Sequence, residues 1–254
     1  MENARLRQCL GSDFARLREM VAGVDAGAPV PSCPEWTVAD LTAHVGAVYL
    51  HKVACMRGGV EPDPWPPAGL ADEATAAPLA LLDRAYGDLT HEFETRAADA
   101  PAGGWYAPDR TVGFLIRRMA QETAIHRLDA ELAAGAPPAP VPDDLAVDGI
   151  DEFLYRFLAY GTEAWLEWAR DVLEGTDGGP VRLSTTGEAW LVRPTPEGVQ
   201  VSPAGAESGL ATVSGTPTDL LCWLWGRAGD DRVAISGDAA RVAQLRKILT
   251  FVAQ

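Results

Sequence analysis

Three side chains in two distant segments could bind one metal ion: His44, Glu122 and His126. Glu122 and His126 stand four residues apart in QETAIHRLDAE, which is predicted to be a helix. At that spacing they lie about 6 Å apart along the helix axis and roughly 40° apart around it. His44 belongs to CPEWTVADLTAHV (residues 33–45), also predicted to be helical. Two nitrogens and one carboxylate oxygen leave positions open for water, substrate or a thiol, as in a catalytic divalent site.

Other histidines and ion pairs compete with this interpretation. His51 lies seven residues beyond His44 on the same helix face, so about 10 Å separates them and only one can bind an ion through bonds of about 2 Å. We expect that one to be His44. Glu122 also stands four residues after Arg118, a spacing typical of a surface ion pair worth tenths of a kcal/mol. His91 falls off the apolar stripe of its helix and is expected to face solvent.

Two acidic residues are expected to support this site. Asp40 stands three residues after Thr37, which is predicted to cap the His44 helix, so its carboxylate can meet the helix N-terminus. Asp129, or a backbone carbonyl, is a candidate acceptor for the second ring nitrogen of His126 and would fix the tautomer of a metal-bound imidazole.

Trp36 is expected in the core or at a domain interface.

Hydrophobic periodicity predicts four helices before residue 133. The first carries Leu6, Leu10, Phe14, Leu17 and Val21 at spacings of three and four. The others are predicted from Thr37 to about Arg57, around Leu79 to Phe93, and from Thr111 to Leu132. Four helices of this length fit a bundle that can hold a metal between facing helices.

The pattern changes in the second half of the chain. PPAPVP (137–142) reads as a linker, and a further helix is predicted from Asp143 to about Phe157. The β-like runs VRLSTT, AWLVRP, GVQVSP and LATVSG follow, and then helices at Thr218–Trp225 and Ala239–Val252. We therefore expect an α+β protein with a helical domain over 1–175, a smaller α+β domain over 176–254, and the boundary near Gly175.

Three motifs carry a resemblance to a known family: CPEWTVADLTAHV, ETAIHRLDAE and SGTPTDLLCWLWGR (214–227). Together they resemble the mycothiol-dependent maleylpyruvate isomerase family. The resemblance implies an N-terminal DinB-like four-helix bundle and a C-terminal domain similar to sterol-carrier folds. It also implies metal ligands at His44, Glu122 and His126, the residues that the spacing had indicated.

Composition excludes some functions. The chain has 21 Lys and Arg against 36 Asp and Glu, a net charge of −15, which disfavours nucleic-acid and anionic-membrane partners. The first twenty residues contain no continuous apolar stretch, so neither a signal peptide nor a membrane span is predicted there, and a cytoplasmic location is expected. The four cysteines, Cys9, Cys33, Cys55 and Cys222, show no C-x-x-C spacing, so free thiols are expected.

The expected activity follows from the resemblance. A divalent metal, with zinc preferred, would bind the sulfur of mycothiol and yield a thiolate that adds to the double bond of a keto acid. Rotation and expulsion of the thiol would give the trans isomer, and Arg227, which follows WLWG, is expected to bind a substrate carboxylate in a bidentate geometry. Three alternatives stay open: a mycothiol S-transferase acting on another electrophile, a non-haem Fe(II) oxygenase, and a non-enzymatic module that binds a metal or small molecule.

Overall fold

The computed structural model describes residues 1–205 and 211–253, and the chain divides into two compact units, Met1–Ala139 and Pro140–Gln254. The division falls before helix α6 (Asp143–Glu152), earlier than the boundary expected near Gly175. Contacts explain the difference. Helix α6 packs against α9 (Pro217–Leu224), and the π-helical segment that follows α6 (Phe153–Tyr160) packs against strand β5 (Gly198–Pro203), so these helices share a core with the sheet. None of the described helices combines the length and apolar character needed to cross a membrane.

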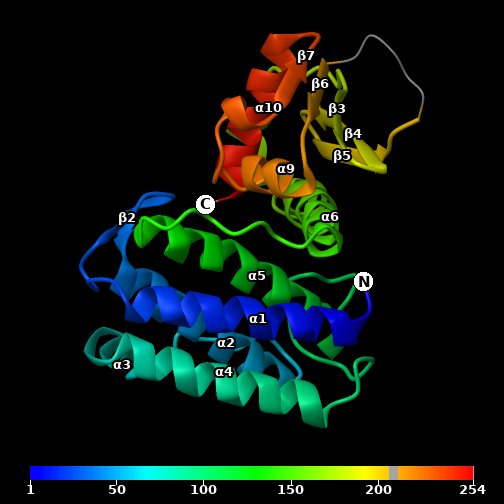
Figure 1. Ribbon diagram of the computed structural model, residues 1–254. Coiled ribbons are helices and arrows are strands. Elements are labelled where there is room, and N and C mark those ends of the chain that lie inside the picture. The colour runs from blue at the N-terminus through cyan, green and yellow to red at the C-terminus, as the bar shows by residue number, and fades with distance from the viewer. Residues whose placement is uncertain (206–210, 254) are drawn as a thin grey trace. The chain divides into compact units, whose positions relative to one another are not determined.

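The first unit is a four-helix bundle in which the predicted helices are confirmed (Figure 1). Within it α1 packs along α5, α2 packs along α4, and α2 also contacts α5. Its elements are α1 (Asn3–Ala22), β1 (Pro29–Val30), β2 (Cys33–Thr37), α2 (Val38–Gly58), α3 (Leu70–Ala76), α4 (Pro78–Thr95) and α5 (Val112–Ala133).

The bundle buries the faces that periodicity had indicated. All five apolar residues of the α1 stripe, Leu6, Leu10, Phe14, Leu17 and Val21, are buried. A polar contact lies within this core, because the hydroxyl groups of Tyr49 on α2 and Thr123 on α5 are 2.6 Å apart. That bond satisfies two buried hydroxyls and links the two helices that carry the histidines and Glu122.

The predicted start of α2 at Thr37 is confirmed, whereas the residues before it were wrongly included in a helical segment. Residues 33–45 as a whole were predicted to be helical, but Cys33–Thr37 forms strand β2, which pairs antiparallel with β1. Thr37 takes the extended conformation that an N-cap requires, with φ −92° and ψ 169°, so the helix cannot begin before Val38. The helical part of the segment still includes His44.

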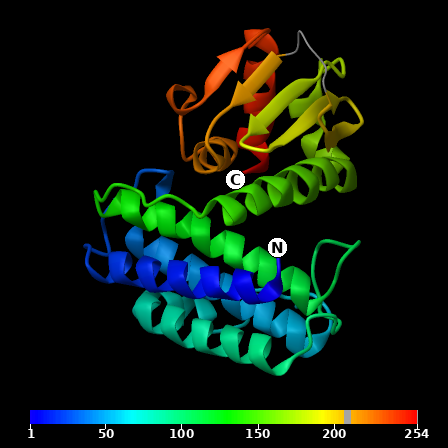
Figure 2. The same ribbon diagram turned by 45° about the vertical axis from the view of Figure 1, so that its right-hand side comes forward.

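The second unit is α+β, as expected. Its strands are ordered β5-β4-β3-β6-β7, and β3–β6 is the parallel pair in an otherwise antiparallel sheet. Helix α10 packs against β3, β6 and β7, and Figure 2 shows it in red behind the arrows. The strands are β3 (Val181–Thr185), β4 (Glu188–Thr195), β5 (Gly198–Pro203), β6 (Ala211–Ser214) and β7 (Ala234–Ser236); Leu210 of the predicted LATVSG run lies outside the described residues.

Helices fill the rest of this unit: α6 (Asp143–Glu152), a π-helical segment (Phe153–Tyr160), α7 (Gly161–Ala164), α8 (Leu166–Leu173), α9 (Pro217–Leu224), a 3₁₀ turn (Asp230–Arg232) and α10 (Ala239–Val252). In this unit Trp223 is fully buried, and Trp225 packs edge-on against Phe153 and Phe157.

Candidate metal centre

Helices α2 and α5 position the candidate ligands, and a capping box fixes where α2 begins. The Thr37 hydroxyl accepts a hydrogen bond from the Asp40 backbone N–H at 3.2 Å, and the Asp40 carboxylate accepts one from the Thr37 backbone N–H at 2.9 Å. The Thr37 hydroxyl also donates to the Asp40 carboxylate at 2.5 Å, and this bond, together with that from the Thr37 N–H, lowers the pKa of Asp40. The expected capping role of Asp40 is therefore confirmed, and it sets the register of α2 one turn before His44.

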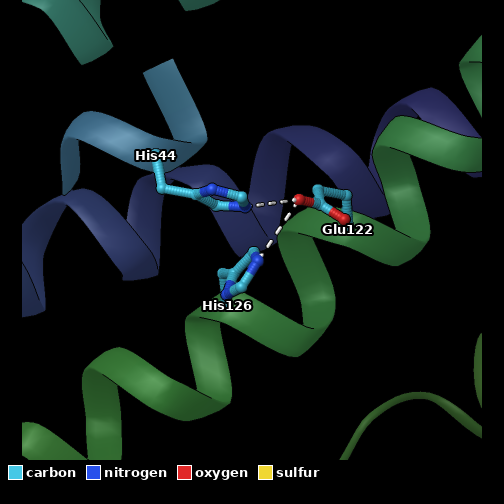
Figure 3. Close-up of side chains that lie close together, drawn as sticks. All are labelled: His44, Glu122 and His126. Atoms are coloured by element: carbon cyan, nitrogen blue, oxygen red, sulfur yellow. Dashed lines mark hydrogen bonds and ion pairs between the residues drawn. The ribbon is translucent and has the colours of Figure 1, made fainter. Parts of the chain in front are cut away.

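The three candidate residues converge on one carboxylate oxygen (Figure 3). Glu122 Oε1 lies 3.3 Å from His44 Nε2 and 3.2 Å from His126 Nε2, and one ligand atom from each residue lies within 4.8 Å of the others. The side chains of His126 and Glu122 are 8% and 16% exposed, whereas that of His44 is 37% exposed. The group is thus sheltered on the α5 side and reached by solvent on the α2 side.

Arg118 holds the other oxygen of the same carboxylate. Its Nη2 donates to Glu122 Oε2 at 2.8 Å, so the ion pair predicted from the i,i+4 spacing exists alongside the histidine contacts. Burial raises the pKa of Glu122, but the charges and hydrogen bonds of His126, His44 and Arg118 outweigh it and hold the pKa well below its usual range. Glu122 is therefore a carboxylate, with Oε1 directed toward both histidines.

His126 is oriented by a buried acid. Its Nδ1 lies 2.9 Å from Asp129 Oδ2, and the side chain of Asp129 is fully buried. Burial lowers the pKa of His126, but the nearby Glu122 and Asp129 carboxylates raise it to about 9. With Nδ1–H donated to Asp129, Nε2 is the nitrogen left for a metal, and binding one there requires the other proton to leave.

One contact in this arrangement was not predicted from the sequence. Ser32, between β1 and β2, donates from Oγ to Asp129 Oδ1 at 2.5 Å. No spacing rule relates a loop serine to a helix 97 residues later. Trp36 on β2 was expected in the core or at a domain interface; it is half-buried rather than in the core, and its ring lies 4.6 Å from that of His44 and 6.0 Å from that of His126. The Trp36 side chain therefore lies beside the two imidazoles, partly exposed to solvent.

The other histidines lie elsewhere. His51 contacts Lys52 and Glu61 rather than Glu122, and His91 is exposed on α4. Arg227 belongs to the second unit, where it follows α9 and its Nη1 donates to the Trp225 carbonyl at 2.8 Å. Its expected role in binding a substrate carboxylate stays a prediction.

Sequence profiles of a known family match both units. The profile of the mycothiol maleylpyruvate isomerase N-terminal domain matches residues 8–131, and the profile of the corresponding C-terminal domain matches residues 144–244. The chain belongs to the mycothiol-dependent maleylpyruvate isomerase family. Family membership agrees with the resemblance carried by the three sequence motifs.

Solved structures support the same fold. The crystal structure of a mycothiol-dependent maleylpyruvate isomerase is 19% identical, with a TM-score of 0.59 over 94% of this chain and 95% of that one. A mutant of a mycothiol-dependent maleylpyruvate isomerase, in which one histidine is replaced by alanine, is 18% identical, with the same TM-score and coverage. No curated protein sequence matches the chain. At these identities the likeness concerns the fold of the family rather than a particular substrate.

Proposed function

We propose that this protein is a zinc- and mycothiol-dependent enzyme that isomerises an unsaturated keto acid from cis to trans. The observation that supports this most directly is the convergence of His44 Nε2 and His126 Nε2 on Glu122 Oε1 in a member of a family named for that reaction. The substrate would be a small electrophilic acid and the second reactant a low-molecular-weight thiol.

The donor set fits a divalent ion. Ligands of a tetrahedral zinc site with bonds of about 2.0–2.1 Å stand about 3.3 Å from one another. The two nitrogen–oxygen separations, 3.3 Å and 3.2 Å, match that spacing. His44, the most exposed of the three, has the most room to adjust its ring. Three protein ligands leave at least one position open, which is typical of catalytic rather than structural zinc.

The bound ion would supply a positive charge that stabilises a thiolate at neutral pH and an enolate as it develops. The chain's own residues then have distinct tasks. Asp129 holds the Nδ1 proton of His126 and keeps Nε2 directed at the ligand group. Arg118 restrains the Glu122 carboxylate through Oε2. Trp36 lies beside both imidazoles.

Metal analysis and product analysis test the proposal. Protein purified without added metal should contain about one divalent ion per chain, and His126→Ala should lose it, whereas His91→Ala on exposed α4 should keep it. With mycothiol and a cis keto acid, the expected product is the trans isomer with no thiol attached. A full equivalent of metal in His126→Ala would contradict the ligand set, and a stable thiol adduct would identify an S-transferase instead.

A further inference from the structure

Lys52 is a buried cation that the proposed metal centre does not use. It lies on α2, it is one of two lysines among the 21 basic residues, and it is 8% exposed. Its ammonium makes one hydrogen bond within the described part of the chain, to His51 Nδ1 at 3.0 Å, and no described carboxylate lies within ion-pair distance of it. Lysine is rarely buried without an anionic partner, because removing an ammonium from water is costly.

The position of Lys52 relates it to the candidate metal centre. It follows His44 by eight residues on α2, about 12 Å along the helix axis. Side chains on a helix lean toward its N-terminus, so the ammonium is carried back toward the His44 end. Burial lowers the pKa of Lys52, whereas Cys55, Glu122 and Glu61 raise it and Arg118 lowers it.

His51 adds a second donor beside Lys52. Burial and the neighbouring Lys52 charge lower the pKa of His51 to about 4, so its ring is neutral at pH 7. Because Nδ1 accepts from Lys52, the ring proton is on Nε2, which lies 3.9 Å from Glu61 Oε1. The Trp65 ring stands edge-on to the imidazole at 4.9 Å. The imidazole thus lies between the Lys52 ammonium at Nδ1 and the Glu61 carboxylate at Nε2.

We propose that the Lys52 ammonium binds a carboxylate of the anionic substrate, with His51 holding the ammonium in place. An ammonium and a carboxylate form strong charge-assisted hydrogen bonds, and a bound carboxylate supplies the counter-ion that the fold itself does not. The assignment of that anion as substrate rests on the proposed function, whereas the binding itself can be measured without turnover.

The test is calorimetric titration of the purified protein with maleate, an unreactive dicarboxylate in the absence of thiol. Wild-type protein should bind it saturably, and Lys52→Met should weaken binding tenfold or more. The matched control is Lys247→Met, which removes the other lysine from an exposed position of α10 and should leave the Kd unchanged. An unchanged Kd in Lys52→Met, or no saturable binding by the wild type, would overturn the proposal.

Stability separates a binding role from a structural one. Methionine keeps the length of lysine and removes an unpaired buried charge, so the Tm of Lys52→Met should equal or exceed that of the wild type. A large loss of Tm in both Lys52→Met and Lys52→Gln would show that the ammonium holds the fold, and the proposal would fail.

The two proposals can fail separately. Lys52-dependent maleate binding without any thiol-dependent turnover would leave the anion site standing and refute the isomerase. Thiol-dependent turnover together with maleate binding that is unchanged in Lys52→Met would support the isomerase and refute the anion site.

Discussion

The hydrogen bond between Asp129 and His126 offers a sharp test of the metal centre. Asp129 is fully buried and accepts from His126 Nδ1 at 2.9 Å and from Ser32 Oγ at 2.5 Å. Removal of such a partner from a metal-binding histidine typically lowers metal affinity 10- to 100-fold, which is about 1.4–2.8 kcal/mol. The size of the effect should depend on what replaces the carboxylate.

Asparagine keeps the shape of Asp129 and one acceptor oxygen, but a neutral acceptor makes a hydrogen bond about half as strong as a charged one. Asp129→Asn should therefore weaken zinc binding about tenfold, and Asp129→Ala, which leaves the imidazole without its partner, about 100-fold. Competition with a chromophoric chelator at fixed pH measures both Kd values.

A buried acid on the same helix provides the control. Glu131 is also fully buried, and it pairs with Arg127 at 2.7 Å and with Arg16 at 3.0 Å rather than with a candidate ligand. Glu131→Gln should lower the Tm, because it breaks buried ion pairs, and leave the zinc Kd unchanged. Equal losses of zinc affinity in the Asp129 and Glu131 variants would refute the reasoning, since they would reflect general loosening of α5.

Three further predictions concern the charge of His126, the packing of Gly103, between α4 and α5, against Val60, and Arg227 of the second unit. Metal-free protein should lose stability as pH rises from 6.5 to 9, because Glu122 and Asp129 raise the pKa of His126 to about 9 against the effect of burial, and the ring stabilises the fold only while it is protonated. Zinc affinity should rise over the same pH range, because zinc binding releases that proton. A zinc titration whose enthalpy is the same in all buffers would contradict this prediction. Gly103→Ala should lower the Tm because the new Cβ would lie 2.2 Å from the Val60 carbonyl carbon. Gly87→Ala, in open space on α4, is the control and should leave the free energy of unfolding unchanged or raise it by up to about 1 kcal/mol. Equal Tm values for the two variants would be inconsistent with this packing. Arg227→Lys should keep the metal and lower kcat/KM by a factor that corresponds to about 1–3 kcal/mol of transition-state stabilisation, since an ammonium lacks the bidentate geometry of a guanidinium. An unchanged kcat/KM would assign Arg227 a structural role.

The sequence predicted the helices of the bundle because each buries one continuous apolar face. It failed at Cys33–Thr37, where the chain pairs with Pro29–Val30 before the Thr37 cap allows a helix to begin. Pairing with a neighbouring strand depends on a turn and a partner strand, and neither produces a hydrophobic periodicity that can be recognised in so short a segment. Strand β7, three residues long, was missed because so short a segment carries no period.

The candidate site was predictable in part. The i,i+4 spacing of Glu122 and His126 follows from helix geometry, but His44 lies 78 residues before Glu122, and only the packing of α2 against α5 brings the two together. Ser32 and Lys52 were missed for the same reason, since their significance lies in what surrounds them. The scarcity of lysine in an arginine-rich chain was the one sequence signal that singled out Lys52.

The ion pair between Arg118 and Glu122 has an electrostatic consequence for any ion held at this site. The guanidinium cancels the charge of the one carboxylate among the candidate ligands, and the two imidazoles must be neutral to bind. The ligand set with its arginine thus carries no net charge, and the buried Asp129 carboxylate behind His126 brings the local total to −1. A divalent ion there would leave a net charge of +1 in surroundings that screen it poorly. In a protein of net charge −15, this small region would then attract a single monoanion, such as a thiolate.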